Sequence, residues 1–117
     1  AKTASFGVEW GIDETLNRLV AMGATDEVIV VGIDNTPDRI PEYTPCCDPK
    51  YGGGKLDAYG AFIVDTVKPY VDRTYRTLPG KDTTAIMGSS LGGIASVAIA
   101  QRYGARFNPR PGWAALI

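Results

Sequence analysis

The sequence predicts an α/β chain in which parallel strands alternate with helices, and three observations lead to this prediction. Apolar stretches with helical spacing alternate along the chain with two short runs rich in β-branched residues. Unbroken apolar runs of this kind are typical of strands covered on both faces, as in parallel sheets. A hydrophobic share of 44% and a charged share of 21% are those of a globular protein, and the 117 residues predict a single domain over 1–117.

The first helix is predicted from its apolar side and its end residues, and the first strand from an apolar run. Residues 13–22 are predicted to form a helix, because apolar residues line one side and Asp13 can cap the start. Gly23 is expected to end that helix. The run VIVVGI at residues 28–33 then predicts a buried strand.

A long loop and a second helix come next. Residues 34–55 contain repeated prolines and three consecutive glycines, and a loop of this length in a compact domain is usually functional or disordered. Apolar residues at three-to-four spacing predict a helix over residues 56–77. Pro69 is expected to kink or split this helix, because proline lacks the N–H that a helix interior needs.

The last elements are a short strand and a helix joined by a glycine-rich turn. Residues 83–87 predict a buried strand, and residues 91–103 predict a helix that is apolar on nearly every face and therefore buried. Strands separated by helices favour parallel, right-handed connections. Since two strands cannot make a stable parallel sheet alone, the predicted architecture is incomplete.

The turn at residues 88–92 has the sequence GSSLG, which matches the G-x-S-x-G pattern of a serine nucleophile. Gly88 and Gly92 would give room for a strained turn that presents Ser90, and the Leu91 N–H would face a developing oxyanion. A bland alternative is that Ser90 only caps the last helix. A phosphate-binding loop is disfavoured, because the G-K-[ST] ending is missing.

Composition excludes several classes of function. A formal net charge of −1 gives no electrostatic case for nucleic acid or an anionic membrane as partner. No apolar run is long enough to span a bilayer, and no signal peptide is visible, which favours the cytoplasm over secretion. The count of histidines is zero, which excludes a histidine-based triad or metal site built from these residues alone. No metal or other cofactor is predicted.

Five polar or aromatic residues in the long loop are further candidates. Asp34 and Asn35 follow the first strand, where they would contact substrate or, as we favour, form an Asx turn. Arg39, Glu42 and Tyr43 would line a substrate cleft; the alternative is that Arg39 pairs with Glu42 while Tyr43 packs. Both interpretations of the second group stay open.

The two cysteines, Cys46 and Cys47, are sequence neighbours. Bonding between adjacent cysteines is strained, so we interpret them as loop thiols, with an intermolecular disulfide as the alternative. The acidic residues of the loop match no calcium-binding spacing, which favours a solvated loop. Tyr59, Tyr70 and Tyr75 fall at helical spacing and are interpreted as packing residues.

Several sequence blocks, in a fixed order over residues 9–107, carry a family resemblance. The blocks are 9–11 (EWG) with Asp13, 29–35 (IVVGIDN), 39–45 (RIPEYTP), 53–55 (GGK), Tyr59 with Phe62, 68–70 (KPY), 75–77 (YRT) and 88–93 (GSSLGG). With them the chain resembles the putative-esterase group of α/β-hydrolases. That group contains feruloyl and acetyl-xylan esterases, enterochelin esterases, esterase D-like S-formylglutathione hydrolases and mycolyltransferases.

The resemblance implies a partial α/β-hydrolase fold with its nucleophile elbow between strand 83–87 and helix 91–103. It implies hydrolysis of a carboxylic ester, small or carbohydrate-linked, through an acyl-enzyme on Ser90, without a cofactor. In that group the acid and the histidine follow the elbow helix, and a strand with the second oxyanion donor precedes residue 9. The chain is therefore expected to be a central fragment, whether natural, frameshifted or truncated. The alternative function is an inactive fragment or pseudo-enzyme that forms homo-oligomers through exposed sheet edges.

Overall fold

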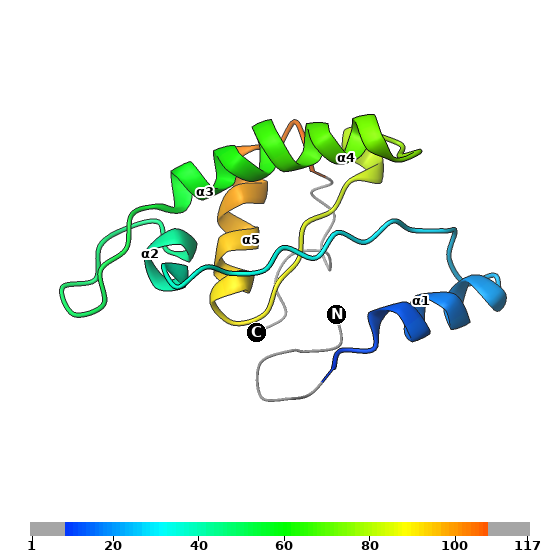
Figure 1. Ribbon diagram of the computed structural model, residues 1–117, viewed down its shortest axis with the longest axis horizontal. Coiled ribbons are helices and arrows are strands. Elements are labelled where there is room, and N and C mark those ends of the chain that lie inside the picture. The colour runs from blue at the N-terminus through cyan, green and yellow to red at the C-terminus, as the bar shows by residue number, and fades with distance from the viewer. Residues whose placement is uncertain (1–8, 108–117) are drawn as a thin grey trace. The chain divides into compact units, whose positions relative to one another are not determined.

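The computed structural model describes residues 9–107, and the chain divides after Asp34 into two compact units (Figure 1). In residues 9–34, the described part of the first unit, there is one helix, α1 (Ile12–Ala21), followed by an irregular segment. The other helices of the described residues, and their buried core, lie in residues 35–107 of the second unit. Within the described part of the chain, no helix combines the length and apolar character needed to span a bilayer.

Helix α1 confirms the first predicted helix to within one residue at each end. Its N-cap is Gly11, in the left-handed region at φ 59°, so Asp13 lies inside the first turn and the expected Asp13 cap is wrong. Asp13 and Glu14 still stabilise the start of α1, because their negative charges lie at the positive end of the helix dipole. No side chain of α1 is buried.

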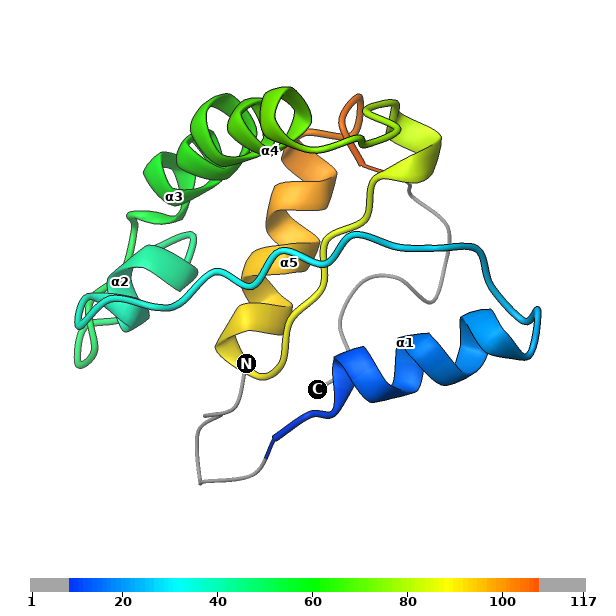
Figure 2. The ribbon, with the colours of Figure 1, turned by 45° about the vertical axis from the view of Figure 1, so that its right-hand side comes forward.

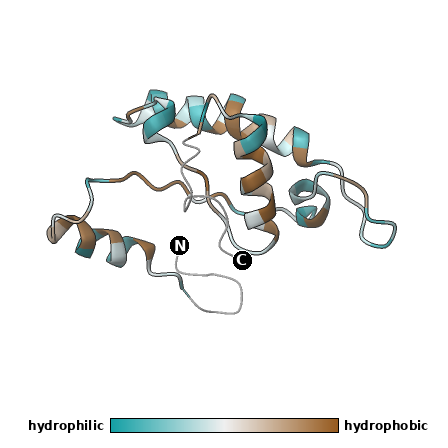
Figure 3. Ribbon diagram, turned by 180° about the vertical axis from the view of Figure 1, so that it is seen from behind, coloured by the Kyte–Doolittle hydropathy of each residue, from teal (hydrophilic) through white to brown (hydrophobic). Residues whose placement is uncertain are grey.

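The predicted strand at residues 28–33 is wrong, because this segment forms no ladder with any described residue. Residues 28–31 are 46–53% exposed, and Figure 3 colours most of the segment as hydrophobic. A parallel strand is stable only when neighbouring strands take its hydrogen bonds and helices cover its faces. Its apolar sequence alone therefore does not make a strand here.

The second predicted strand, residues 83–87, is wrong as well. A 3₁₀ turn, η3 (Lys81–Thr83), occupies its start, and residues 84–87 are unpaired. The hydroxyls of Thr83 and Thr84 donate to the carbonyl oxygen of Gly80 at 3.0 and 2.8 Å, so local bonds replace a ladder.

The predicted α/β fold with parallel strands is accordingly corrected. Residues 9–107 are helical and irregular, and their β pairing is limited to one isolated antiparallel bridge between Asp48 and Gly52. The sheet is absent from the described residues because neither apolar run has a strand beside it. The expected sheet edges are absent with it.

The second predicted helix is a nearly continuous run of three segments. These are α3 (Leu56–Phe62), a π-helical turn η2 (Ile63–Val67) and α4 (Lys68–Thr74). Pro69 is the second residue of α4, and the wider π-helical turn just before α4 accommodates the missing N–H and the bulk of the ring without ending the helix. The run ends at Thr74, earlier than predicted, because Tyr75 is extended.

Helix α5 (Leu91–Arg102) confirms the last predicted helix and packs against α3 and the short α2 (Arg39–Tyr43) (Figures 1 and 2). The buried core contains Tyr43, Leu56, Ile63, Val64, Ala95, Ile99 and Phe107. Gly60 of α3 permits the approach of α5, since a Cβ there would lie 3.3 Å from Ile99 Cγ1. Only one face of α5 is buried, so the expectation that it is covered on nearly every face is wrong: Ile94 is 52% exposed.

We predict that Ile99→Ala lowers the free energy of unfolding by about 2–5 kcal/mol, because it opens a cavity at the contact of α5 with α3. The matched control is Ile94→Ala on the exposed face of the same helix, with an expected change below about 0.5 kcal/mol. Urea denaturation followed by circular dichroism measures both. Equal effects of the two variants would contradict this packing.

We predict that the chain self-associates through the exposed apolar residues 28–33 rather than through a sheet edge. Val30→Lys places a charge in this segment and is expected to shift the chain toward monomer, because a charged residue opposes strand pairing and apolar contact. Sedimentation velocity measures the change. Met22→Lys, 71% exposed and outside the segment, is the control. A wild-type chain that stays monomeric at high concentration would refute the prediction.

Candidate active site

Ser90 has the most unusual backbone among the described residues. At φ 54° and ψ −122° it is the one non-glycine residue with positive φ in that part of the chain. A conformation of this kind costs about 1–3 kcal/mol and persists only where the surrounding structure imposes it. It occurs where irregular residues turn sharply into α5, so Ser90 stands at the tip of that turn.

The glycines that flank Ser90 differ in their roles. A Cβ on Gly88 would lie 2.4 Å from the carbonyl oxygen of Gly92, which no neighbour can relieve because the contact is with backbone. A Cβ on Gly92 would meet nothing within 4 Å. Of the two glycines, Gly88 alone therefore has to be a very small residue in this structure, whereas a larger residue fits at Gly92.

The first turn of α5 leaves one backbone donor free. The N–H groups of Gly92 and Gly93 donate to the carbonyl oxygens of Ser89 and Ser90, both at 2.9 Å. The N–H of Leu91 has no acceptor among the described residues. It lies at the positive end of the helix dipole, directly after Ser90.

The Ser90 side chain does not cap α5. Ser90 occupies the N-cap position, yet its hydroxyl makes no capping hydrogen bond and the residue is exposed. The bland interpretation of Ser90 as a helix cap is therefore wrong. The first turn is held by backbone bonds, and the buried Ser96 adds one side-chain bond, from its Oγ to the carbonyl oxygen of Gly92 at 2.7 Å.

Asp34 and Asn35 stand on either side of the division between the two units, and both are exposed. The Asn35 side chain donates to the carbonyl oxygen of Thr36 at 3.1 Å. Thr36 Oγ1 accepts the N–H of Asp38 at 3.1 Å, so the turn is built on threonine and the expected Asx turn is not found.

Arg39, Glu42 and Tyr43 all lie in α2. Glu42 accepts a hydrogen bond from the hydroxyl of Thr36 at 2.8 Å, whereas the Arg39–Glu42 pair, one of the two interpretations, is not formed. The Arg39 guanidinium carbon lies 6.0 Å from the centre of the Tyr43 ring. Tyr43 is buried, so the structure favours packing for this residue.

Tyr43 pairs with Tyr59 of α3 inside the core. The ring centres are 4.8 Å apart, and the Tyr59 hydroxyl donates to that of Tyr43 at 3.3 Å. Burial, and then this hydrogen bond, raise the pKa of Tyr59. The Tyr59 phenol therefore stays neutral at ordinary pH, and the pair ties α2 to α3.

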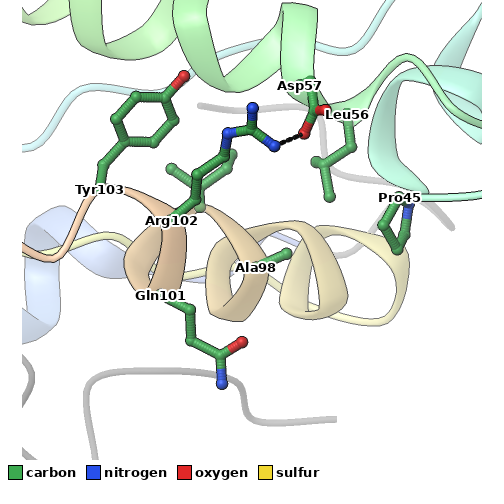
Figure 4. Close-up of a pocket in the computed structure, with 8 residues that line it drawn as sticks. Pro45, Leu56, Asp57, Ala98, Gln101, Arg102 and Tyr103 are labelled. Carbon is green, nitrogen blue, oxygen red and sulfur yellow. Dashed lines mark hydrogen bonds and ion pairs between the residues drawn. The ribbon is translucent and has the colours of Figure 1, made fainter.

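A surface pocket of about 340 Å³ lies at the other end of α5 from Ser90 (Figure 4). Its apolar lining comes from Pro45, Leu56, Ala98 and Ile99, and an ion pair between Arg102 and Asp57 lies beside it. Sequence reasoning missed this pocket. Both charged side chains are more than half exposed, so their pairing contributes little to stability.

Three carboxylates of the described residues come close enough together to hold a cation. Those of Glu9, Asp13 and Glu14 lie within 4.8 Å of one another around the start of α1, and all three are exposed. The acidic residues of the loop do not join such a group: Asp38 pairs with Lys55 at 2.7 Å, and Asp48 accepts the N–H groups of Lys50 and Tyr51.

A protein-family model matches residues 4–109, most of the length of the chain. The match defines the class of the protein as an ester hydrolase. The chain belongs to the putative esterase family, which confirms the resemblance predicted from the sequence blocks. No curated protein and no solved structure matches the chain significantly.

We predict that Gly88→Ala lowers the free energy of unfolding by about 1–3 kcal/mol, because its methyl group overlaps the Gly92 backbone. Gly92→Ala is the matched control and is expected to be neutral or stabilising by up to about 1 kcal/mol, since alanine favours helix. Urea denaturation measures both variants. A Gly88→Ala variant as stable as Gly92→Ala would contradict the close approach at this turn.

Proposed function

We propose that the chain supplies the nucleophile of a serine carboxylic-ester hydrolase, with Ser90 as the attacking residue. The observation that carries the proposal is the sharp, positive-φ backbone of Ser90. It holds an exposed hydroxyl that makes no cap at the start of α5. Family membership supports the ester-hydrolase class, and the backbone of Ser90 supports this residue as the one that reacts.

In the proposed reaction, Ser90 Oγ attacks the carbonyl carbon of the ester while a general base takes the hydroxyl proton. The Leu91 N–H donates to the resulting oxyanion, aided by the positive end of the α5 dipole. Collapse of the tetrahedral intermediate expels the alcohol and leaves an acyl group on Ser90. Water then attacks this acyl-enzyme and releases the carboxylic acid, which restores the serine.

The proposed reaction needs a general base, and these 117 residues contain no histidine to serve as one. A histidine base would come from residues outside this sequence or from another molecule. A serine with an ordinary pKa is a weak nucleophile without such a partner. The proposal therefore assigns to this chain the nucleophile and one oxyanion donor.

For the substrate we propose a small-molecule or carbohydrate-linked ester, with no cofactor. Ser90 is exposed at the tip of a turn, so an ester carbonyl can reach it without opening a buried site. Asp34, Asn35, Arg39 and Glu42 stay candidates for substrate contact. Tyr43 is a weaker candidate, because its side chain is buried against Tyr59.

The second candidate function is a non-catalytic chain that associates with itself. The observation that favours it is the exposed apolar segment at residues 28–33. Exposed apolar segments of this kind mark surfaces that another chain covers. Dependence of ester chemistry on Ser90 separates the two candidates.

We predict that imidazole in solution, as a stand-in for the histidine side chain, accelerates labelling of Ser90 by a fluorophosphonate. A positioned general base contributes about 10²–10⁴-fold, so a freely diffusing base is expected to give a smaller gain of about tenfold. Peptide mass spectrometry locates the label. The reagent forms a covalent bond with a serine hydroxyl that a base activates, so the label reports the nucleophile directly.

The control pair is Ser90→Ala and Ser89→Ala, which remove neighbouring hydroxyls in the same turn. Ser90→Ala is expected to abolish the imidazole-dependent label, whereas Ser89→Ala keeps it. Labelling at Ser89 or at a cysteine, or a rate that does not depend on Ser90, would contradict the assignment of the nucleophile.

A further inference from the structure

Two free thiols face each other in the loop between α2 and α3. The Sγ atoms of Cys46 and Cys47 are 3.4 Å apart, and both residues are exposed. Side chains of consecutive residues in an extended chain point to opposite sides. The chain bends at residues 45 and 46, so the pair departs from this extended arrangement.

Two glycines with positive φ pack against the cysteine pair. Gly53 has φ 138°, and a Cβ there would lie 2.6 Å from the carbonyl oxygen of Cys46. Gly54 has φ 93°, and a Cβ there would lie 3.6 Å from Cys47 Sγ. The returning part of the loop thus passes close to the backbone of Cys46, and there is room for no side chain at residue 53.

Backbone hydrogen bonds close this loop around the pair. The N–H of Gly54 donates to the carbonyl oxygen of Thr44 at 3.0 Å. Asp48 and Gly52 exchange two further bonds at 2.9 and 2.8 Å. The cysteines lie between these cross-links, so the dithiol belongs to a closed loop.

The chemistry of the pair is limited by its number of ligands. A structural zinc site takes four ligands, whereas this pair offers two sulfur atoms. The nearest acidic residue in sequence, Asp48, uses Oδ1 to accept the N–H groups of Lys50 and Tyr51. The acidic group that could hold a cation among the described residues does not include either cysteine. Exchange of thiol for disulfide is the chemistry that two facing thiols carry out without further ligands.

We propose that Cys46 and Cys47 form a reversible thiol–disulfide exchange site whose substrates are small-molecule disulfides. The thiolate of Cys46 attacks one sulfur of the disulfide, forming a mixed disulfide and expelling one thiolate. The thiolate of Cys47 then attacks Cys46 Sγ, forming the Cys46–Cys47 bond and expelling the second thiolate. The small molecule gains two electrons and two protons, and the cysteine pair loses the same number.

Hydrogen bonding orders the two steps. The backbone N–H of Cys47, and then its thiol, lower the pKa of Cys46. The hydrogen bond between the two side chains, and then the charge of Cys46, raise the pKa of Cys47. Cys46 is therefore the sulfur that is ionised first and attacks, and Cys47 is the resolving thiol. A bond between adjacent cysteines is strained, which makes the oxidised form easy to reduce and the site reversible.

Oxidised glutathione tests the proposal on the full chain, with the products separated under denaturing conditions and weighed by mass spectrometry. The wild-type chain is expected to lose two hydrogen atoms and to carry no glutathione at equilibrium. Cys47→Ser is expected to accumulate one glutathione on Cys46, because the resolving thiol is gone. Cys46→Ser is expected to react at least about threefold more slowly than Cys47→Ser, because the backbone N–H of residue 47 still lowers the pKa of Cys46 in the Cys47→Ser variant.

Phenylarsine oxide, which bonds two neighbouring thiols at once, gives a second measurement. The wild-type chain is expected to hold it at least about tenfold more tightly than either single variant. A wild-type chain that keeps glutathione, forms disulfide-linked dimers or does not react would overturn the proposal. So would arsenical binding equal to that of the single variants. Labelling of Ser90 is independent of these outcomes.

Discussion

The close contact of α5 with α3 is the constraint on which the second unit depends. Gly60 brings the two helices together at Ile99, and a Cβ at residue 60 would crowd the side chains of Ile99 and Tyr103 at 3.3 and 3.2 Å. Ala95, one turn earlier on the same face of α5, joins the buried core with Ile63 and Val64. Because α5 begins at Leu91, the packing that fixes this helix also fixes the turn that carries Ser90.

The helices could be predicted from the sequence, because their signals are local. Gly23 and the acidic first turn predicted the ends of α1 to within one residue. The apolar run after Ser90 predicted the ends of α5 with equal accuracy. The strands could not be predicted, since an apolar run only favours burial, whereas a strand also requires a hydrogen-bonding neighbour. Residues 28–33 and 83–87 lack that neighbour among the described residues. Pro69 interrupts the α-helical pattern as predicted, through a π-helical turn rather than by ending the helix.

Part of the candidate site could also be predicted, because it depends on residues close together in the sequence. The GSSLG pattern predicted the strained turn, and both the positive φ of Ser90 and the crowding at Gly88 follow from five consecutive residues. The partner of Glu42 could not be predicted, because Thr36 lies outside the short helix that holds Arg39 and Glu42. The short distance between the two cysteine sulfurs also depends on Gly53 and Gly54, several residues further on.

These differences separate two requirements of a serine esterase. The position of the nucleophile depends on nearby residues, because the strained backbone at Ser90, the Gly88 contact and the Ser96 bond to the Gly92 carbonyl all lie within the elbow and the start of α5. Activation of the nucleophile depends on distant residues, because a base must approach Ser90 from elsewhere in the fold. The backbone conformation of Ser90 costs about 1–3 kcal/mol, and the burial of the Ile99 face of α5 stabilises the helix against it. A chain that folds α5 can therefore hold the nucleophile in position before any base is present.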